Sequence, residues 1–223
     1  MKIKLNIPEK LSEMTLGQYQ NWLKVSEGKE LDTFLQQKII EIFCGITLKE
    51  VMQIKASDID RLVTGISNIF VEEPKFIDRF DYGGKEFGFI PKLDDISFGE
   101  YVDLDTYLQD WQLMHKAMAV LFRPVIYKPK KKWYNFFIWK FIDKSKYLIE
   151  DYESAEKYDL KCMPLNVVFG SLVFFYHLRS ELLRHILNYL ANQTGIKVSP
   201  KLRGFLKNGV GTAPFMDLQK ATF

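Results

Sequence analysis

The sequence predicts a mainly α-helical, multi-helix domain with one small β-hairpin and an extended C-terminal tail. Apolar side chains recur at helical spacing along most of the chain, a capping-box pattern marks three helix starts, and two glycines separate two aromatic-rich runs. We expect one mainly helical domain over residues 1–193, with the hairpin at about residues 75–90. A basic tail is expected over residues 194–223.

The composition is that of a folded protein. Of 223 residues, 47% are hydrophobic, 26% are charged and 15% are aromatic, which excludes disorder across most of the chain. The first residues lack the apolar core of a signal peptide. The longest apolar run is shorter than the ~20 residues that cross a bilayer, so we expect no membrane-spanning segment.

Three capping boxes predict the starts of three helices. In each box, a Ser or Thr side chain caps the helix and a Glu or Gln three residues later bonds back to the capping residue. The pairs are Thr15 with Gln18, Thr47 with Glu50, and Ser97 with Glu100. The first of these helices should end near Gly28, because glycine adopts the left-handed conformation that closes a helix.

Two further helices are predicted in the first third of the chain. Residues 31–44 carry a one-sided apolar stripe that includes Phe34, and Gly45 is placed as the C-terminal stop. Ser57 is expected to cap a second amphipathic helix that runs to Phe70.

The hairpin is the clearest β signal. Gly83 and Gly84 stand between two short aromatic-rich runs, which is the composition of a tight hairpin turn. Because a lone hairpin is marginal in water, it must pack on the helices or pair with another strand, such as residues 2–7.

Two long helical patterns follow the hairpin. Residues 98–121 carry apolar side chains at helical spacing, Phe98 and Tyr101 among them, until Pro124 stops the pattern. Residues 164–193 form the last large helix, and its first half is apolar nearly all round. That half should therefore lie centrally in the fold or in an assembly.

A segment after Pro124 interleaves lysines with aromatic side chains. Such a segment can bind single-stranded nucleic acid, lie at a membrane interface, bind a protein, or form an exposed loop that leads into a core strand. Its candidate partner-binding residues are Lys130, Lys131, Lys132, Trp133, Tyr134, Phe137 and Trp139. The tail adds Lys201, Arg203 and Phe205, and we expect it to order only against a partner.

Charge is unevenly distributed along the chain. Residues 72–110 contain eleven acidic and four basic residues, a net charge of −7, whereas residues 128–146 contain seven lysines and one aspartate, a net charge of +6. These stretches could attract each other within one fold or between copies. The total of +3 is too small to indicate nucleic-acid binding by itself.

No catalytic or metal-binding pattern is evident in the sequence. The three histidines lack metal-ligand spacing, and no nucleophile motif is present. Cys44 and Cys162 are expected to be buried free thiols. We therefore expect no enzymatic activity, no metal and no cofactor.

Residues 15–125 resemble a family of small proteins from the structural-gene regions of tailed bacteriophages of Bacteroidetes, including crAss-like phages. The segments that carry the resemblance are TLGQYQNWL, QQKIIEIFCGI, FGFIPKLDDISFGEYVDLDTYL and MHKAMAVLFRPV. Such proteins tend to be labelled virion proteins or tail assembly chaperones. The family supplies no catalytic or cofactor residues.

The resemblance implies a virion protein at the portal, neck or tail that works through contacts with other virion proteins and with copies of itself. It would be a neck component or internal cargo ejected with the genome, and it would occupy the host cytoplasm during assembly. One alternative is a soluble tail assembly chaperone that is left out of the particle. Another is a nucleic-acid-binding protein that uses residues 128–141.

Overall fold

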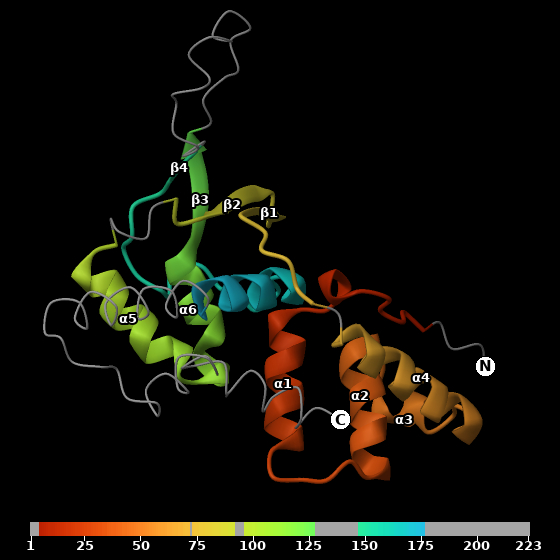
Figure 1. Ribbon diagram of the computed structural model, residues 1–223. Helices are drawn as coiled ribbons and strands as arrows, with labels where there is room; N and C mark the ends of the chain where they lie inside the picture. Colours follow the sequence, from red (N-terminus) through yellow and green to blue (C-terminus); the bar gives the residue numbers. More distant parts are fainter. Residues whose placement is uncertain (1–4, 72, 92–95, 128–146, 177–223) are drawn as a thin grey trace, which may run out of the picture. The chain divides into compact units, whose positions relative to one another are not determined.

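The computed structural model describes residues 5–71, 73–91, 96–127 and 147–176 (Figure 1). Contacts divide the chain into two compact units, which we call the helical unit and the sheet unit. The helical unit comprises Met1–Met14, Asn21–Phe76 and Pro164–Phe223, and the sheet unit comprises Thr15–Gln20 and Ile77–Met163. The prediction of a single domain over residues 1–193 stays a prediction.

The helical unit is built from short amphipathic helices. After a 3-10 helix at Leu11–Glu13 come α1 (Leu16–Ser26), which begins in the sheet unit, then α2 (Thr33–Cys44), α3 (Leu48–Val51) and α4 (Ala56–Ile69). A further helix covers residues 165–176. The Asp32 side chain caps α2 by accepting a hydrogen bond from Leu35 N at 2.8 Å, and Gly45 ends α2 at φ 68°.

Aromatic contacts and one close backbone approach hold the helical unit together. The Phe70 ring, at the end of α4, lies 5.7 Å from the Phe43 ring and 6.4 Å from the Phe169 ring. A Cβ atom on Gly170 would lie 2.2 Å from the carbonyl oxygen of Lys75, so the chain passes over residues 165–176 at a point where only glycine fits.

The sheet unit contains a four-stranded antiparallel sheet and two helices. The strands β1 (Arg79–Tyr82), β2 (Lys85–Phe89), β3 (Phe122–Tyr127) and β4 (Leu148–Ile149) lie side by side in chain order. Between β2 and β3 come α5 (Phe98–Leu108), a 3-10 helix at Trp111–Leu113, and α6 (Met114–Leu121). The hairpin turn is made by Gly83 and Gly84, both at positive φ.

The predicted fold class is confirmed as mainly α with a small β-hairpin. All three capping boxes form, and the first half of the helix expected at residues 164–193 is helical and largely buried. The predicted tail at residues 194–223 lies outside the described residues. In the part of the chain that can be described, no helix is both long and apolar enough to cross a membrane.

Four details of the sequence prediction are wrong. The run at residues 98–121 is broken at Asp110, which caps the 3-10 helix through a 2.8 Å bond from Gln112 N. Pro124 does not stop the helical run, because β3 already begins at Phe122 and pairs with β2. Lys55, rather than Ser57, precedes α4 and makes no side-chain cap. Phe34 is exposed, because it lies on the α2 face opposite the buried stripe.

The hairpin pairs with β3, a strand that the sequence pattern does not predict. Phe87 of β2 faces Pro124 of β3, and the Ile90 N–H donates to the Leu121 carbonyl at 2.9 Å. Residues 5–7, the described part of the strand proposed at residues 2–7, are not in a strand.

Candidate functional site

The predicted partner-binding residues all lie outside the described residues. This holds for Lys130, Lys131, Lys132, Trp133, Tyr134, Phe137 and Trp139, and equally for Lys201, Arg203 and Phe205. The first group belongs to the stretch of chain that joins β3 to β4. Those assignments therefore stay predictions, and the candidate site is built from described residues.

Helix α5 presents an apolar face to solvent. Phe98 is 81% exposed, Tyr101 55% and Val102 43%. These positions follow the i, i+3, i+4 spacing that places side chains on one side of a helix. We call these three residues the α5 face. Exposed large apolar side chains grouped on one helix are characteristic of a binding surface.

The opposite side of α5 is fixed to the sheet by a buried ion pair. Glu100 and Leu104 are both buried, and one Glu100 carboxylate oxygen accepts a hydrogen bond from Arg123 Nη2 of β3 at 2.8 Å. The other oxygen accepts from the Ser97 N–H at 2.7 Å, which closes the capping box. Glu100 thus joins the helix start to the strand.

A second polar contact fixes the middle of α5. The Tyr152 hydroxyl donates to the Asp103 carboxylate, and the Arg123 guanidinium lies 5.8 Å from the Tyr152 ring centre. Burial, followed by the hydrogen bond to Asp103, raises the pKa of Tyr152 above its usual range, so the phenol stays protonated. These two contacts join α5 to β3 and to Tyr152 while its apolar face stays exposed.

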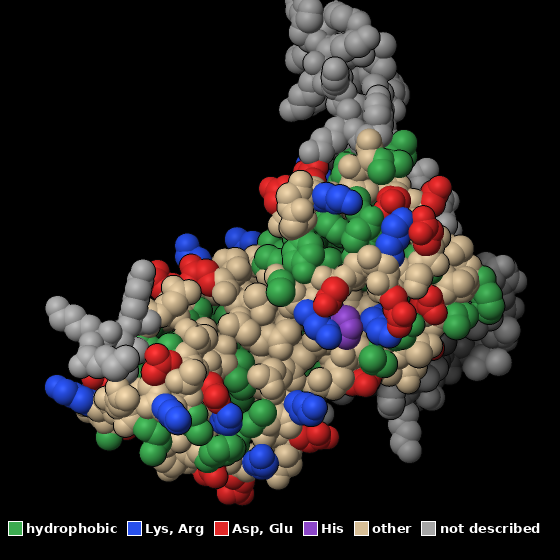
Figure 2. Space-filling view, turned by 180° about the vertical axis from the view of Figure 1, so that it is seen from behind, with side chains coloured by type: hydrophobic (Ala, Val, Ile, Leu, Met, Phe, Trp, Pro, Cys, Tyr) green, Lys and Arg blue, Asp and Glu red, His purple; other side chains and the backbone are tan. Residues whose placement is uncertain are grey.

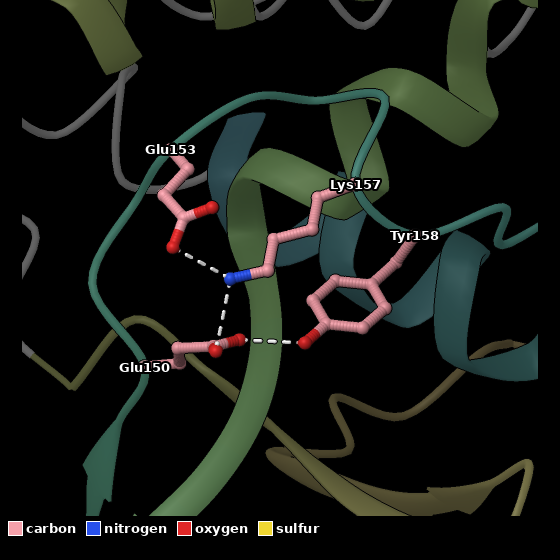
Figure 3. Close-up of polar contacts among 4 residues, drawn as sticks. All are labelled: Glu150, Glu153, Lys157 and Tyr158. Atoms are coloured by element: carbon pink, nitrogen blue, oxygen red, sulfur yellow. Dashed lines mark hydrogen bonds and ion pairs between the residues drawn. The ribbon is translucent and has the colours of Figure 1, made fainter.

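The loop after β4 carries a cluster of charged and aromatic groups (Figure 3). Lys157 Nζ lies 2.9 Å from Glu150 and 2.8 Å from Glu153, and the Tyr158 hydroxyl donates to Glu150 at 2.7 Å. The Tyr158 ring packs edge-on against Phe87 of β2 with ring centres 5.3 Å apart. The cluster therefore ties the loop to the hairpin, and as a set of exposed ion pairs it adds little stability.

His115, near the start of α6, joins a network with Gln20 of α1. The buried Gln20 side chain donates to the Trp111 and Gln112 carbonyls at 2.8 and 3.1 Å, and its nitrogen lies 3.2 Å from His115 Nδ1. Figure 2 shows basic and acidic side chains interspersed over one face of the molecule. Burial, and then the charges of Lys161 and Lys116, lowers the pKa of His115.

We expect this lowered pKa to make folding stability fall in mild acid. Since the His115 pKa is lower in the folded than in the unfolded chain, His115 contributes stability above about pH 6.5 that is lost as the pH falls through its folded pKa. Thermal unfolding at pH 7.0 and 5.5 should show a smaller drop in melting temperature for His115→Gln than for wild type. An equal or larger drop for His115→Gln would contradict this assignment.

A separate open groove lies on α4 of the helical unit. Its volume is about 520 Å³. Its lining consists of Leu31, Gln36, Asp60, Val63, Thr64, Ser67, Asn68 and Val71. Asp60 is the one ionisable group among them, so the groove offers no acid–base pair for catalysis.

The described residues show no grouped metal ligands. No set of three or more His, Cys, Asp or Glu side chains within the described ranges could hold a metal ion. Both cysteines are free thiols. Cys44 is buried as expected, but Cys162 is exposed, because it lies in a turn just before residues 165–176.

No protein-family model, curated protein or solved structure matches this chain.

The sequence pattern does not predict that the α5 face is exposed. The charged residue Glu100 is buried on the packed side of the helix, where apolar side chains are expected. The helical spacing of Phe98 and Tyr101 favours packing of these side chains in the core, since burial of Glu100 is unfavourable without a partner. Arg123, 23 positions later, supplies that partner. The sequence does contain one signal for the buried side of α5. Glu100 and Leu104 are four residues apart, so they share one side of the helix.

Proposed function

We propose that this chain is a non-enzymatic protein of a tailed bacteriophage particle, located at the portal, neck or tail, which acts by binding other virion proteins and copies of itself. The observation that carries the proposal is the α5 face, whose three apolar side chains remain in solvent while the opposite side of the helix is fixed by Glu100 and Arg123. Placement in a phage particle rests on the resemblance of residues 15–125.

The contacts of the ionisable groups support binding rather than catalysis. The carboxylates of Glu100 and Asp103 are engaged in contacts that fix α5, and those of Glu150 and Glu153 hold a surface loop. His115 faces the Gln20 amide, with its pKa lowered by burial. In each case the polar group has a structural role that accounts for its position.

Mass spectrometry of purified phage particles tests the proposal. We expect peptides of this chain in mature particles, at a constant ratio to the portal protein after density-gradient purification. Absence from particles, together with recovery in a complex with a tail protein from infected cells, would contradict the proposal and identify an assembly chaperone instead.

A further inference from the structure

We propose that the α5 face binds residues 128–141 of a second copy of this chain, so that copies associate head to tail. The inference rests on the proposed function, because it names a partner for the same face.

The charges of the two surfaces are complementary. Helix α5, with sequence FGEYVDLDTYL, contains three carboxylates and no basic residue. Glu100 is paired with Arg123 and Asp103 accepts from Tyr152, whereas Asp105 is exposed and lacks a partner among the described residues. Residues 128–141 contain five lysines and no acidic residue. Opposite charges around an apolar contact favour this pairing over association of two identical α5 faces.

The apolar chemistry also matches. Residues 133–141 contain six aromatic side chains, namely Trp133, Tyr134, Phe136, Phe137, Trp139 and Phe141. Aromatic residues are enriched at the centres of protein interfaces and supply most of their binding free energy. The α5 face offers an aromatic and aliphatic surface of the same kind.

The position of β3 favours a second copy over the chain's own segment. Residue 128 follows directly from β3, and β3 lies on the buried side of α5 through the Arg123–Glu100 pair. Phe98 and Glu100 are about 200° apart around the helix axis. Strand β3, from which the segment continues, therefore contacts α5 on the side opposite the exposed face, and a second copy can approach that face directly.

Two different surfaces that bind each other give a heterologous interface. An open assembly keeps one unused surface of each kind, one at either end, so the association continues until it closes into a ring or extends as a filament. This geometry distinguishes the proposal from a two-fold dimer, in which one surface binds its own copy.

Mixing two complementary variants tests the inference. The face variant combines Phe98→Gln, Tyr101→Gln and Val102→Gln, and the segment variant combines Lys130→Gln, Lys131→Gln and Lys132→Gln. Analytical ultracentrifugation of nucleic-acid-free protein at 50 mM NaCl should show concentration-dependent assemblies for wild type. Each variant alone should associate at least about tenfold more weakly. Their mixture should form a 1:1 dimer that does not grow, because one intact surface of each kind remains.

Matched controls isolate the two surfaces. Met52→Gln changes another exposed apolar side chain, and Lys10→Gln combined with Lys49→Gln and Lys55→Gln removes the same charge elsewhere. Both controls should associate as wild type does. Circular dichroism of every variant should match wild type, because the substituted side chains of the described residues are exposed.

Several outcomes would overturn the inference. A wild-type chain that stays monomeric at 100 µM would indicate that its own segment covers the α5 face or that another protein does. Unchanged association of the segment variant would indicate contact between two α5 faces. Assembly that requires added single-stranded DNA would indicate a nucleic-acid site at residues 128–141.

Failure of the inference can be distinguished from failure of the proposed function. A chain found in mature particles but monomeric in isolation would remove head-to-tail association and leave the virion assignment in place. A chain that assembles in isolation but is absent from particles would remove the virion assignment and leave head-to-tail association in place.

Discussion

Replacing Glu100 with alanine should destabilise the folded chain by roughly 3–5 kcal/mol, because it leaves the Arg123 guanidinium buried without its counter-ion. Arg123 Nε already lacks a hydrogen-bond partner among the described residues, so little is available to compensate. Urea unfolding followed by circular dichroism measures the change. Replacing both members of the pair, as Glu100→Leu with Arg123→Met, should recover most of the loss.

Glu50→Ala is the matched control for this prediction. Glu50 closes a capping box at α3 just as Glu100 does at α5, but it is paired with no buried arginine. Its loss should cost roughly 1 kcal/mol, the usual effect of removing a cap. Equal costs for Glu50→Ala and Glu100→Ala would contradict a structural role for the buried ion pair.

Replacing Gly170 with alanine should destabilise the helical unit by roughly 1–3 kcal/mol or more. The added Cβ would lie 2.2 Å from the Lys75 carbonyl oxygen and 2.8 Å from the carbonyl carbon, both of which are backbone atoms that cannot rotate away. Urea unfolding provides the measurement, with wild type and variant compared at equal protein concentration.

Gly65→Ala should have the opposite effect. Gly65 lies inside α4 with no atom within 4 Å of the position that its Cβ would occupy. Alanine should stabilise the chain there by about 0.5–1 kcal/mol through its higher helix propensity. Destabilisation of similar size at both positions would show that the close approach at Gly170 is not the cause.

The Glu100–Arg123 pair matters for function as well as for stability. A surface that is already held in its bound geometry loses less conformational entropy on binding. The pair holds α5 from its buried side, and the Tyr152–Asp103 hydrogen bond holds it again one turn later. The α5 face can therefore contact a partner without rearrangement of the helix. Glu100→Ala should weaken partner binding even under conditions in which the chain remains folded.

Local signals in the sequence were sufficient to predict the three helix starts with capping boxes and the hairpin. A capping box needs only residues three positions apart, and the turn at Gly83 and Gly84 needs only its two glycines. The same holds for Gly45, whose left-handed conformation ends α2. These features depend on neighbouring residues, so one sequence suffices to find them.

Features that depend on distant residues were not predicted. Strand β3 was not predicted, because it depends on the pairing of Phe122 with Phe89 of the hairpin, which lies 33 positions earlier. The exposure of the α5 face was not predicted, because it depends on Arg123, which makes the burial of Glu100 favourable. In both cases a long-range contact overrides the local pattern.

Incorporation of variants into particles tests most directly whether the α5 face binds virion partners. Tagged wild type, Met52→Gln and the face variant would be expressed in host cells during infection, and each would be quantified by mass spectrometry of purified particles. We predict equal incorporation of wild type and Met52→Gln, and loss of at least about nine-tenths of the face variant. Incorporation of the folded face variant at the wild-type level would contradict the assignment of this face as the binding surface.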